Sequence, residues 1–261
     1  MAFSLDTKRK NFNTLHKKIQ TMKLSFVIPA YNEEKGIAKT LDEIKETSKK
    51  LLDKKIIDDF EVIVVDNNSK DRTKELAKSK GVRVLTEKKQ GYGAAYKTGL
   101  KNATGDIIIT GDGDNSYPFC DAERLLKELQ DCDFITTNRL AGLLEGSMPI
   151  LNHIGNKILT FVFQLLYNHK IKDSQSGMWA FRKDFLDELN FDLMSDGMPF
   201  SQQIKIVAIS AKKQIKEIPI IYRKRIGFKK LRNLRDGFDN LNQLIWFKFK
   251  LHKVNKKNNN V

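Results

Sequence analysis

Short apolar runs alternate with amphipathic stretches along the first half of the chain. Four runs have the length and β-branched content of buried strands: residues 24–30, 60–66, 82–87 and 106–114. Three stretches between them have helical spacing: residues 33–52, 71–80 and 92–102. In the first of these, Ile37, Leu41, Ile44 and Leu51 fall on one face, which we expect to point inward. Strands that alternate with helices are joined by right-handed crossovers, so the pattern predicts an α/β fold with a mostly parallel central sheet.

Two apolar stretches in the second half of the chain also have helical spacing. The first is residues 158–167, and the second includes Leu234, Phe238, Leu241, Ile245 and Phe249, with Trp246 and basic residues around them. Both are shorter than the roughly 18 apolar residues that span a bilayer. The second pattern is typical of a helix at a membrane interface, and equally of a helix packed on the domain.

The net charge of +15 is concentrated at the two ends of the chain. Residues 1–23 contain six Lys or Arg and one acidic residue, and residues 222–261 contain twelve and two. The segment between them contains 29 of each sign and is neutral. Basic ends attract nucleic acid or anionic lipid headgroups, and charge alone does not choose between them.

Cysteine content and the N-terminal sequence bear on the compartment. Cys120 and Cys132 have neither a disulfide-framework pattern nor metal-ligand spacing, which suits a reducing compartment. No apolar core follows the basic residues 8–10, so we expect no secretory signal. We therefore expect a cytoplasmic protein.

Three of the predicted strands end in polar clusters, at residues 29–34, 66–71 and 112–114. Ligands of parallel α/β sheets bind at the carboxyl ends of the strands. Asp112 and Asp114 flank Gly113, so both carboxylates can reach one divalent cation, which takes oxygen ligands and bridges to substrate phosphates. The alternative is a polar turn without a ligand.

Two other segments are compatible with ligand binding. Asp66 could accept hydrogen bonds from a base or ribose, or could form an Asx turn or helix cap together with Asn68 or Ser69. The glycines of Gly91-Tyr92-Gly93 would let backbone approach a ligand, but glycines before a helix are common.

These segments resemble glycosyltransferase family 2, within it the group of dolichyl-phosphate mannose and glucose synthases. The likeness rests on VIPAYNEE, EVIVVDNNSKDRT, GYGAAYKTGLKNATGDIIITGDGDNSYP and DSQSGMWAFRKD, and extends in order over residues 24–231. It implies a GT-A (Rossmann-like) nucleotide-sugar-binding fold, inversion at the anomeric carbon, a UDP- or GDP-sugar donor, and Mg²⁺ or Mn²⁺ as cofactor.

The resemblance also implies roles for individual residues. The nucleotide-sugar site would comprise Pro29, Ala30, Tyr31, Asn32, Glu33, Asp66, Asn68, Gly91, Lys97, Asp112 and Gly113. Asp112 and Asp114 would hold the metal and diphosphate, with Arg139 near the sugar phosphate. The acceptor site would comprise Gln175, Ser176, Gly177, Arg225, Lys229 and Lys230. The chain departs from the group at Ser116, where mannose synthases tend to have Gln, at Trp179, and at Lys229, which replaces Ser.

The resemblance implies transfer of a hexose to a polyprenyl phosphate at the cytoplasmic face of an anionic membrane. A phosphate oxygen is already anionic and needs only alignment and a stabilised leaving group. A sugar hydroxyl acceptor would instead need a carboxylate base, and Asp173 is the candidate. The base of the donor, the hexose, the polyprenol and the oligomeric state stay open.

Other functional classes fit less well. A nucleic-acid-binding protein would explain the basic ends but not the polar strand ends, and no nucleic-acid module is recognisable. A nucleotidyltransferase would have a Gly-rich, Arg-bearing loop where this chain has AYNEE. A catalytically inactive relative would not need both aspartates. We divide the chain into a basic extension (1–22), a catalytic domain (23–231), and a basic amphipathic helix with a tail (232–261).

Overall fold

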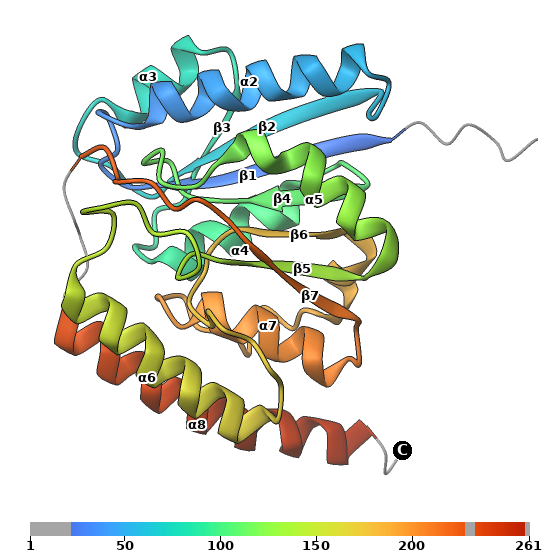
Figure 1. The fold of residues 1–261 in the computed structure, drawn as a ribbon, viewed down its shortest axis with the longest axis vertical. Helices are drawn as coiled ribbons and strands as arrows, with labels where there is room; N and C mark the ends of the chain where they lie inside the picture. The colour runs from blue at the N-terminus through green and yellow to red at the C-terminus, as the bar shows by residue number, and fades with distance from the viewer. Residues whose placement is uncertain (1–21, 228–232, 259–261) are drawn as a thin grey trace, which may run out of the picture.

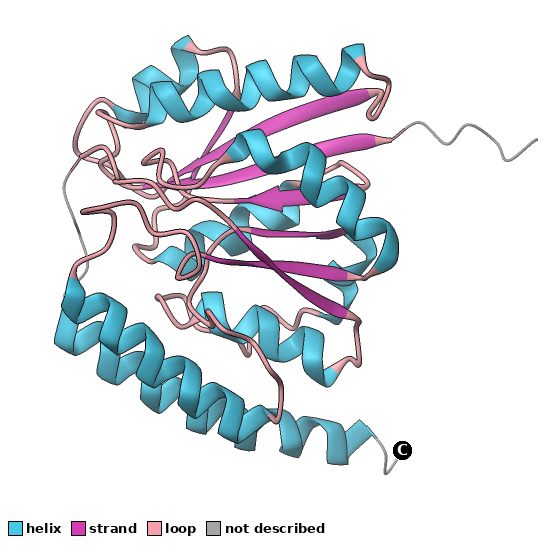
Figure 2. Ribbon diagram, viewed as in Figure 1, coloured by secondary structure: helices cyan, strands magenta, loops and turns pink. Residues whose placement is uncertain are grey.

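The computed structural model describes residues 22–227 and 233–258. A central sheet has helices on both faces, and two long helices lie together beyond one edge of the layered body (Figures 1 and 2). Residues 1–21 of the predicted basic extension, and Lys229 and Lys230, lie outside the described part of the chain.

The sheet has seven strands in the order β3-β2-β1-β4-β6-β5-β7. The strands are β1 (Lys23–Ala30), β2 (Asp59–Asp66), β3 (Arg83–Thr86), β4 (Ile107–Thr110), β5 (Phe134–Asn138), β6 (Trp179–Arg182) and β7 (Ile215–Pro219). All neighbours are parallel except β6, which runs antiparallel to both β4 and β5. The mostly parallel α/β sheet predicted from the sequence is therefore confirmed.

Seven α-helices are present in the described residues. They are α2 (Ile37–Asp53), α3 (Thr73–Ser79), α4 (Tyr92–Asn102), α5 (Ala122–Glu128), α6 (Ile150–Tyr167), α7 (Phe200–Ser210) and α8 (Asn233–Asn258). Three short 3₁₀ segments, Phe119–Asp121, Leu129–Asp131 and Lys183–Glu188, complete the connections.

Each face of the sheet has its own hydrophobic core, because successive strand residues point to opposite sides. In β1, Phe26 and Ile28 pack in the core that includes α2 and α5, whereas Val27 packs in the core that includes α4 and α7. The four α2 residues predicted to point inward are fully buried. The second core also extends to α6 and α8 through Phe163 and Phe247.

Helices α6 and α8 lie side by side (Figure 1) and are linked by hydrogen bonds. Tyr167 Oη donates to the Leu244 carbonyl at 2.7 Å, and Lys248 Nζ donates to the Leu166 carbonyl at 2.6 Å. Several large apolar side chains on these helices stay exposed, among them Ile150, Phe161, Leu165, Phe238, Trp246 and Phe249. No helix in the described residues combines the length and the apolar character needed to cross a membrane.

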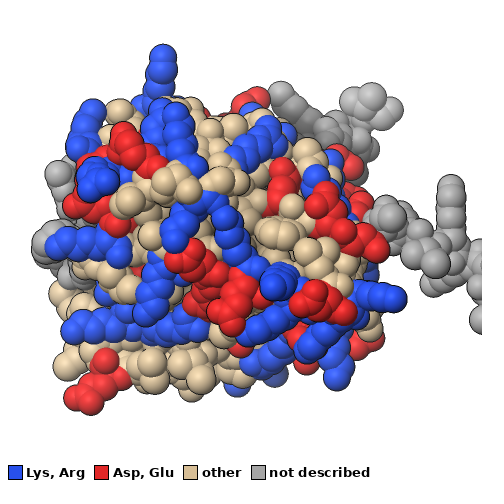
Figure 3. All heavy atoms as spheres, turned by 90° about the horizontal axis from the view of Figure 1, so that it is seen from above, with Lys and Arg blue, Asp and Glu red and all other residues tan. Residues whose placement is uncertain are grey.

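The surface charge of the body agrees with its neutral composition. On the face seen from above, Lys and Arg side chains are interspersed with Asp and Glu side chains and with uncharged surface (Figure 3). Such a face lacks the single-sign patch that a phosphate backbone requires.

Candidate active site

The predicted polar clusters lie together at the carboxyl ends of the parallel strands. Ala30 and Asp66 are paired in the register of β1 and β2, and the Asn67 amide donates to the Ala30 carbonyl at 2.8 Å. The Gly36 position lies so close to Asp114 that a Cβ there would be 2.9 Å from the Asp114 Cα. The loops after β1, β2 and β4 therefore form one continuous site.

The two aspartates after β4 differ in their surroundings. Asp112 Oδ1 accepts a hydrogen bond from Tyr92 Oη at 3.2 Å, and burial together with the nearby Asp114 charge raises the pKa of Asp112 to about 7. Asp114 is almost fully buried and accepts hydrogen bonds from the Ser116 amide and hydroxyl at 3.0 and 2.6 Å. Asn115 has a left-handed conformation (φ 64°), so the chain turns directly after Asp114.

The donor set fits a divalent cation shared with a substrate. Mg²⁺ is usually held by one or two carboxylates plus substrate phosphates, rather than by a complete protein cage. Asp112 and Asp114 supply two carboxylates, and the described residues contain no cluster of three or more His, Cys, Asp or Glu suited to a metal. The mutual repulsion that raises the pKa of Asp112 would be relieved by such a cation.

Arg225 joins residues from three predicted subsites. Its Nη2 lies 2.9 Å from Glu33 Oε1 and 3.3 Å from Asp114 Oδ2. The segment that carries it is fixed by backbone hydrogen bonds, from the Arg223 amide to the Ser116 carbonyl and from the Ile226 amide to the Asp114 carbonyl. The nucleotide, metal and acceptor residues predicted from the sequence thus converge at this guanidinium.

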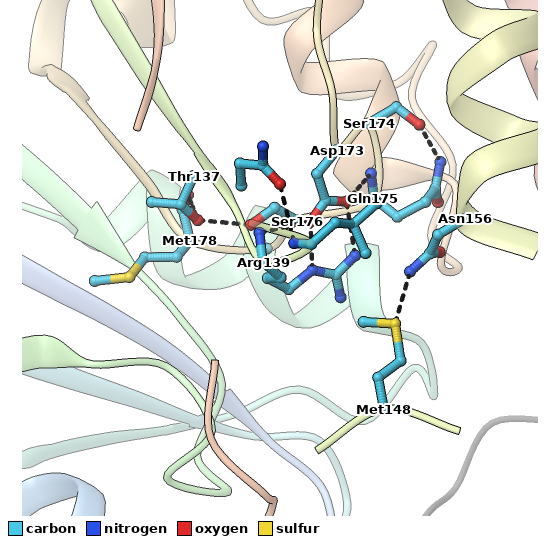
Figure 4. A network of polar contacts seen from close by, with 12 residues as sticks. Thr137, Arg139, Met148, Asn156, Asp173, Ser174, Gln175, Ser176 and Met178 are labelled. Atoms are coloured by element: carbon cyan, nitrogen blue, oxygen red, sulfur yellow. Dashed lines mark hydrogen bonds and ion pairs between the residues drawn. The ribbon is translucent and has the colours of Figure 1, made fainter. Parts of the chain in front are cut away.

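Arg139 and Asp173 form a buried ion pair (Figure 4). Arg139 Nε and Nη2 donate to the two Asp173 oxygens at 2.8 and 2.9 Å, and the Arg139 amide adds a third bond at 3.0 Å. Burial alone would raise the pKa of Asp173, but the Arg139 charge and hydrogen bonds outweigh it and hold that pKa below its ordinary value.

This geometry argues against Asp173 as a general base. The side chain is fully buried, both oxygens are occupied by Arg139, and its lowered pKa makes it a weak proton acceptor. Asp173 instead orients Arg139, whose guanidinium lies 5.4 Å from the centre of the Tyr222 ring.

The predicted acceptor loop divides into one half-buried side chain and a buried frame. Gln175 lines a cavity, whereas Ser176 and Gly177 are buried. Ser176 Oγ is hydrogen bonded to Thr137 Oγ1 at 2.7 Å, and the Gly177 carbonyl accepts from Tyr96 Oη and Thr110 Oγ1. A Cβ at Gly177 would be 2.2 Å from Tyr92 Oη, so a larger residue there would displace the Tyr92 hydroxyl that contacts Asp112.

The predicted nucleotide residues occupy the loops after β1 and β2. Pro29 and Ala30 are buried in β1, and Tyr31 follows them. Asn32 ties the two loops together, because its Oδ1 accepts from the Lys70 amide at 2.7 Å and its amide donates to Ser69 Oγ. Asn68 is left-handed (φ 61°) and exposed beside the buried Asp66.

Two predicted nucleotide residues, Gly91 and Lys97, contact the segment around Asp196. A Cβ at Gly91 would be 2.2 Å from the Asp196 carbonyl oxygen, so this glycine packs against the 195–197 loop. Lys97 Nζ donates to the Met194 carbonyl at 2.7 Å and to Asp196 at 2.6 Å. In the described structure both residues fasten that loop to α4.

A cavity of about 370 Å³ opens between α6 and α8 and extends to the active site. Its walls are mostly apolar and include Leu151, Ile154, Ile158, Phe238 and Leu241. Arg139, Tyr222 and Arg225 also line it, and connect it with the residues described above. The arrangement is a mostly apolar groove whose lining includes two arginine cations.

Several site residues were not singled out in the sequence analysis. Tyr92, Tyr117 and Tyr222 surround the aspartates and Arg139, but a single tyrosine carries no sequence signal that distinguishes a site residue from a core residue. Lys205 of α7 was also missed. It is fully buried, and its partners come from segments far away in the sequence.

Comparisons with known proteins agree with this architecture. The family described as Glycosyl transferase family 2 matches residues 25–189. A Haloferax volcanii hexosyltransferase of low-salt glycan biosynthesis, Agl6, is 35% identical over 222 residues, which are 82% of this chain and 51% of that protein. The chain thus spans about half the length of this relative.

Two further relatives are covered over most of their length. A dolichyl-phosphate hexose transferase of Haloferax volcanii is 29% identical (80% of this chain, 86% of that protein). The human dolichyl-phosphate beta-glucosyltransferase is also 29% identical (80% and 70%). Glucosyl-3-phosphoglycerate synthase from Mycobacterium tuberculosis, crystallised with Mn²⁺ and UDP, superposes with a TM-score of 0.65 at 21% identity, over 87% of this chain and 78% of that one. The last likeness supports the fold.

Proposed function

This chain belongs to glycosyltransferase family 2, and from that premise we propose that it transfers a hexose from a nucleotide-sugar to a polyprenyl phosphate. The observation that carries the proposal is the apolar groove between α6 and α8, which ends at Arg139 and Arg225. A polyprenyl phosphate has the same two parts, an apolar chain and an anionic head. Two relatives whose names specify dolichyl phosphate support this acceptor.

On the donor side, Asp112 and Asp114 would hold Mg²⁺ or Mn²⁺ together with the diphosphate of the nucleotide-sugar. The bound metal would supply neutralisation of the leaving nucleoside diphosphate. Crystals of the structurally similar synthase contain UDP with Mn²⁺ or Mg²⁺. The loops after β1 and β2, with Tyr31, Glu33 and Asp66, would bind the nucleoside.

On the acceptor side, the two arginines would bind and orient the phosphate. An anionic phosphate oxygen needs no general base, so catalysis consists of aligning it behind the anomeric carbon. Asp173 keeps the Arg139 guanidinium fixed by two side-chain hydrogen bonds. The hydroxyl-acceptor alternative is less compatible with this geometry, because its candidate base is consumed in that ion pair.

We further propose that the enzyme works peripherally on an anionic membrane. The groove opens between helices whose exposed side chains include Phe161, Leu165, Trp246 and Phe249. The sequence that precedes and forms α8 is rich in Lys and Arg, which favours anionic headgroups. A lipid acceptor could then enter the groove directly from the bilayer.

The test is acceptor-stimulated release of nucleoside diphosphate. Purified protein with Mn²⁺ or Mg²⁺ is given a panel of UDP- and GDP-sugars and either a short polyprenyl phosphate or the matching unphosphorylated polyprenol. We expect one donor to be consumed faster with the phosphate only. Stimulation by the polyprenol or by a sugar, with none by the phosphate, would refute the proposal.

A further inference from the structure

Helix α7 buries an unusual set of polar side chains. Ser201, Gln202, Gln203 and Lys205 are 0–2% exposed, although such residues are seldom fully buried unless they are paired. An unsatisfied polar group would cost stability at each position. The partners of these side chains therefore indicate what the helix holds in place.

Lys205 binds the backbone on both sides of Gln175. Its Nζ donates to the Ser174 carbonyl at 2.9 Å and to the Ser176 carbonyl at 2.7 Å, and a third bond goes to the Ser201 carbonyl. The ammonium also lies 5.5 Å from the centre of the Trp179 ring. All three ammonium donors are thus satisfied, and two of them fix the acceptor loop.

Gln202 binds the side chain of the same residue. Its Oε1 accepts from Gln175 Nε2 at 2.9 Å, and its Nε2 donates to the Asn240 carbonyl of α8 at 2.7 Å. Gln175 also contacts Ser174 Oγ, as the close-up shows (Figure 4). Gln202 thereby connects the wall of the groove to the helix that forms its other side.

We propose that Lys205 and Gln202 are positioning residues for the acceptor, which hold Gln175 at the groove beside Arg139. The inference rests on the proposed function and adds determinants of acceptor affinity that contact no substrate. Gln175 is the one member of the predicted triplet 175–177 whose side chain lines the groove. Residues of α7 fix both the backbone around Gln175 and its side-chain amide. Asp173, which orients Arg139, lies two residues away and accepts a hydrogen bond from the Gln175 backbone N–H.

The neighbouring residue Gln203 provides a matched control. It lies on the same helix and is equally buried, but its Oε1 accepts from the Ser195 amide and its Nε2 contacts Gln243. Neither partner lines the groove. Replacing Gln203 removes the same kind of buried hydrogen bonds as replacing Gln202, without touching the acceptor loop.

The experiment compares Lys205→Met, Gln202→Met and Gln203→Met with wild type. Methionine is unbranched and of similar volume, so each helix position keeps its shape. The KM for acceptor, the KM for donor and kcat are measured below the unfolding temperature of every variant. We expect Lys205→Met and Gln202→Met to raise the acceptor KM about tenfold, the size of one well-placed hydrogen bond. The donor KM should stay within about twofold.

Gln203→Met should leave both KM values within about twofold of wild type while losing thermal stability comparable to Gln202→Met. An equal rise of acceptor KM in Gln203→Met, or no rise in Gln202→Met, would overturn the inference. If Lys205→Met fails to fold, the glutamine pair decides alone. If wild type transfers only to a hydroxyl acceptor, the proposed function fails, and the same comparison with that acceptor decides the inference.

Discussion

At the scale of single residues, the site contains acidic side chains with two different proposed roles, holding a metal ion and orienting an arginine. Burial and the nearby Asp114 charge raise the pKa of Asp112, and a bound cation would offset both effects. Asp173 already has its cation in Arg139 and serves orientation. The sequence predicted the first pair from a strand end, whereas the partner of Asp173 is 34 positions away in the chain.

The metal role of Asp114 predicts a specific defect. Asp114→Asn keeps the size of the side chain but removes one of two carboxylate ligands, so metal-dependent turnover should fall at least about 100-fold. Binding of Mn²⁺ in the presence of UDP, measured by calorimetry, should weaken in parallel, with the circular dichroism spectrum unchanged. Full metal-dependent activity would show that Asp114 is not a ligand.

The Arg139–Asp173 pair predicts a pH-dependent stability. The pKa of Asp173 is lowered in the folded protein, so its contribution is complete above the ordinary pKa and is lost as pH falls below about 4. Asp173→Asn leaves a buried guanidinium unpaired and should cost about 3–5 kcal/mol at pH 7.

Urea denaturation of wild type and Asp173→Asn at pH 7 and at pH 3.5 checks this prediction. The difference between the two unfolding free energies should shrink at the lower pH, because Asp173 of unfolded wild type then binds a proton that the folded state, with its lowered pKa, does not bind. A difference that is the same at both pH values would mean that the ion pair does not contribute as described.

At the scale of elements, the helix pair α6–α8 separates two kinds of apolar residue. All four side chains named here are exposed, but Ile154 and Ile158 line the groove, whereas Phe161 and Leu165 do not. The sequence predicted apolar helices in both regions, but the choice between lipid contact and core packing depends on which helix lies alongside. Which helix lies alongside is decided by contacts between residues far apart in the sequence, which the local pattern does not show.

Charged substitutions at Ile154 and Leu165 should separate the groove from the outer face. Ile154→Asp puts a carboxylate beside the acceptor chain and should raise the KM for a long polyprenyl phosphate about tenfold or more. Leu165→Asp, on the same helix, should leave the KM for a short, detergent-free acceptor unchanged. Equal effects of the two variants on the short acceptor would exclude the groove as its site.

The outer face predicts binding to vesicles. Phe161→Ser combined with Leu165→Ser removes two exposed apolar side chains and should weaken sedimentation with anionic vesicles about tenfold or more. Stability should hardly change, because neither side chain is in the core. Unchanged vesicle binding would mean that another surface docks on the membrane.

The bounds of some elements could be predicted from the sequence more accurately than those of others. Strand β1 and helix α4 were predicted within one residue of their bounds, since a buried parallel strand and a Gly-punctuated helix have strong local patterns. The run at 106–114 was too long, because β4 ends at Thr110 and the site loop begins there. The antiparallel direction of β6 had no local signal, as direction is decided by the strands on either side.

At the scale of the whole molecule, the sheet brings donor and acceptor residues from the whole length of the catalytic region to one edge. In the proposed function, the loops after β1, β2 and β4 would form the donor side, and the 173–177 loop with Arg139 and Arg225 would form the acceptor side. The apolar groove reaches this edge from the α6–α8 pair. The account therefore predicts a lipid-linked product rather than a water-soluble one.

The most direct measurement is the chemical nature of that product. Radiolabelled nucleotide-sugar, Mn²⁺ and polyprenyl phosphate are incubated with the enzyme, and the organic phase is extracted and treated with mild acid. The account predicts enzyme-dependent label in the organic phase that mild acid returns to water as free hexose, because a glycosyl phosphate bond is acid-labile. Label that stays in the aqueous phase, or that remains lipid-bound after acid, would contradict transfer to the phosphate.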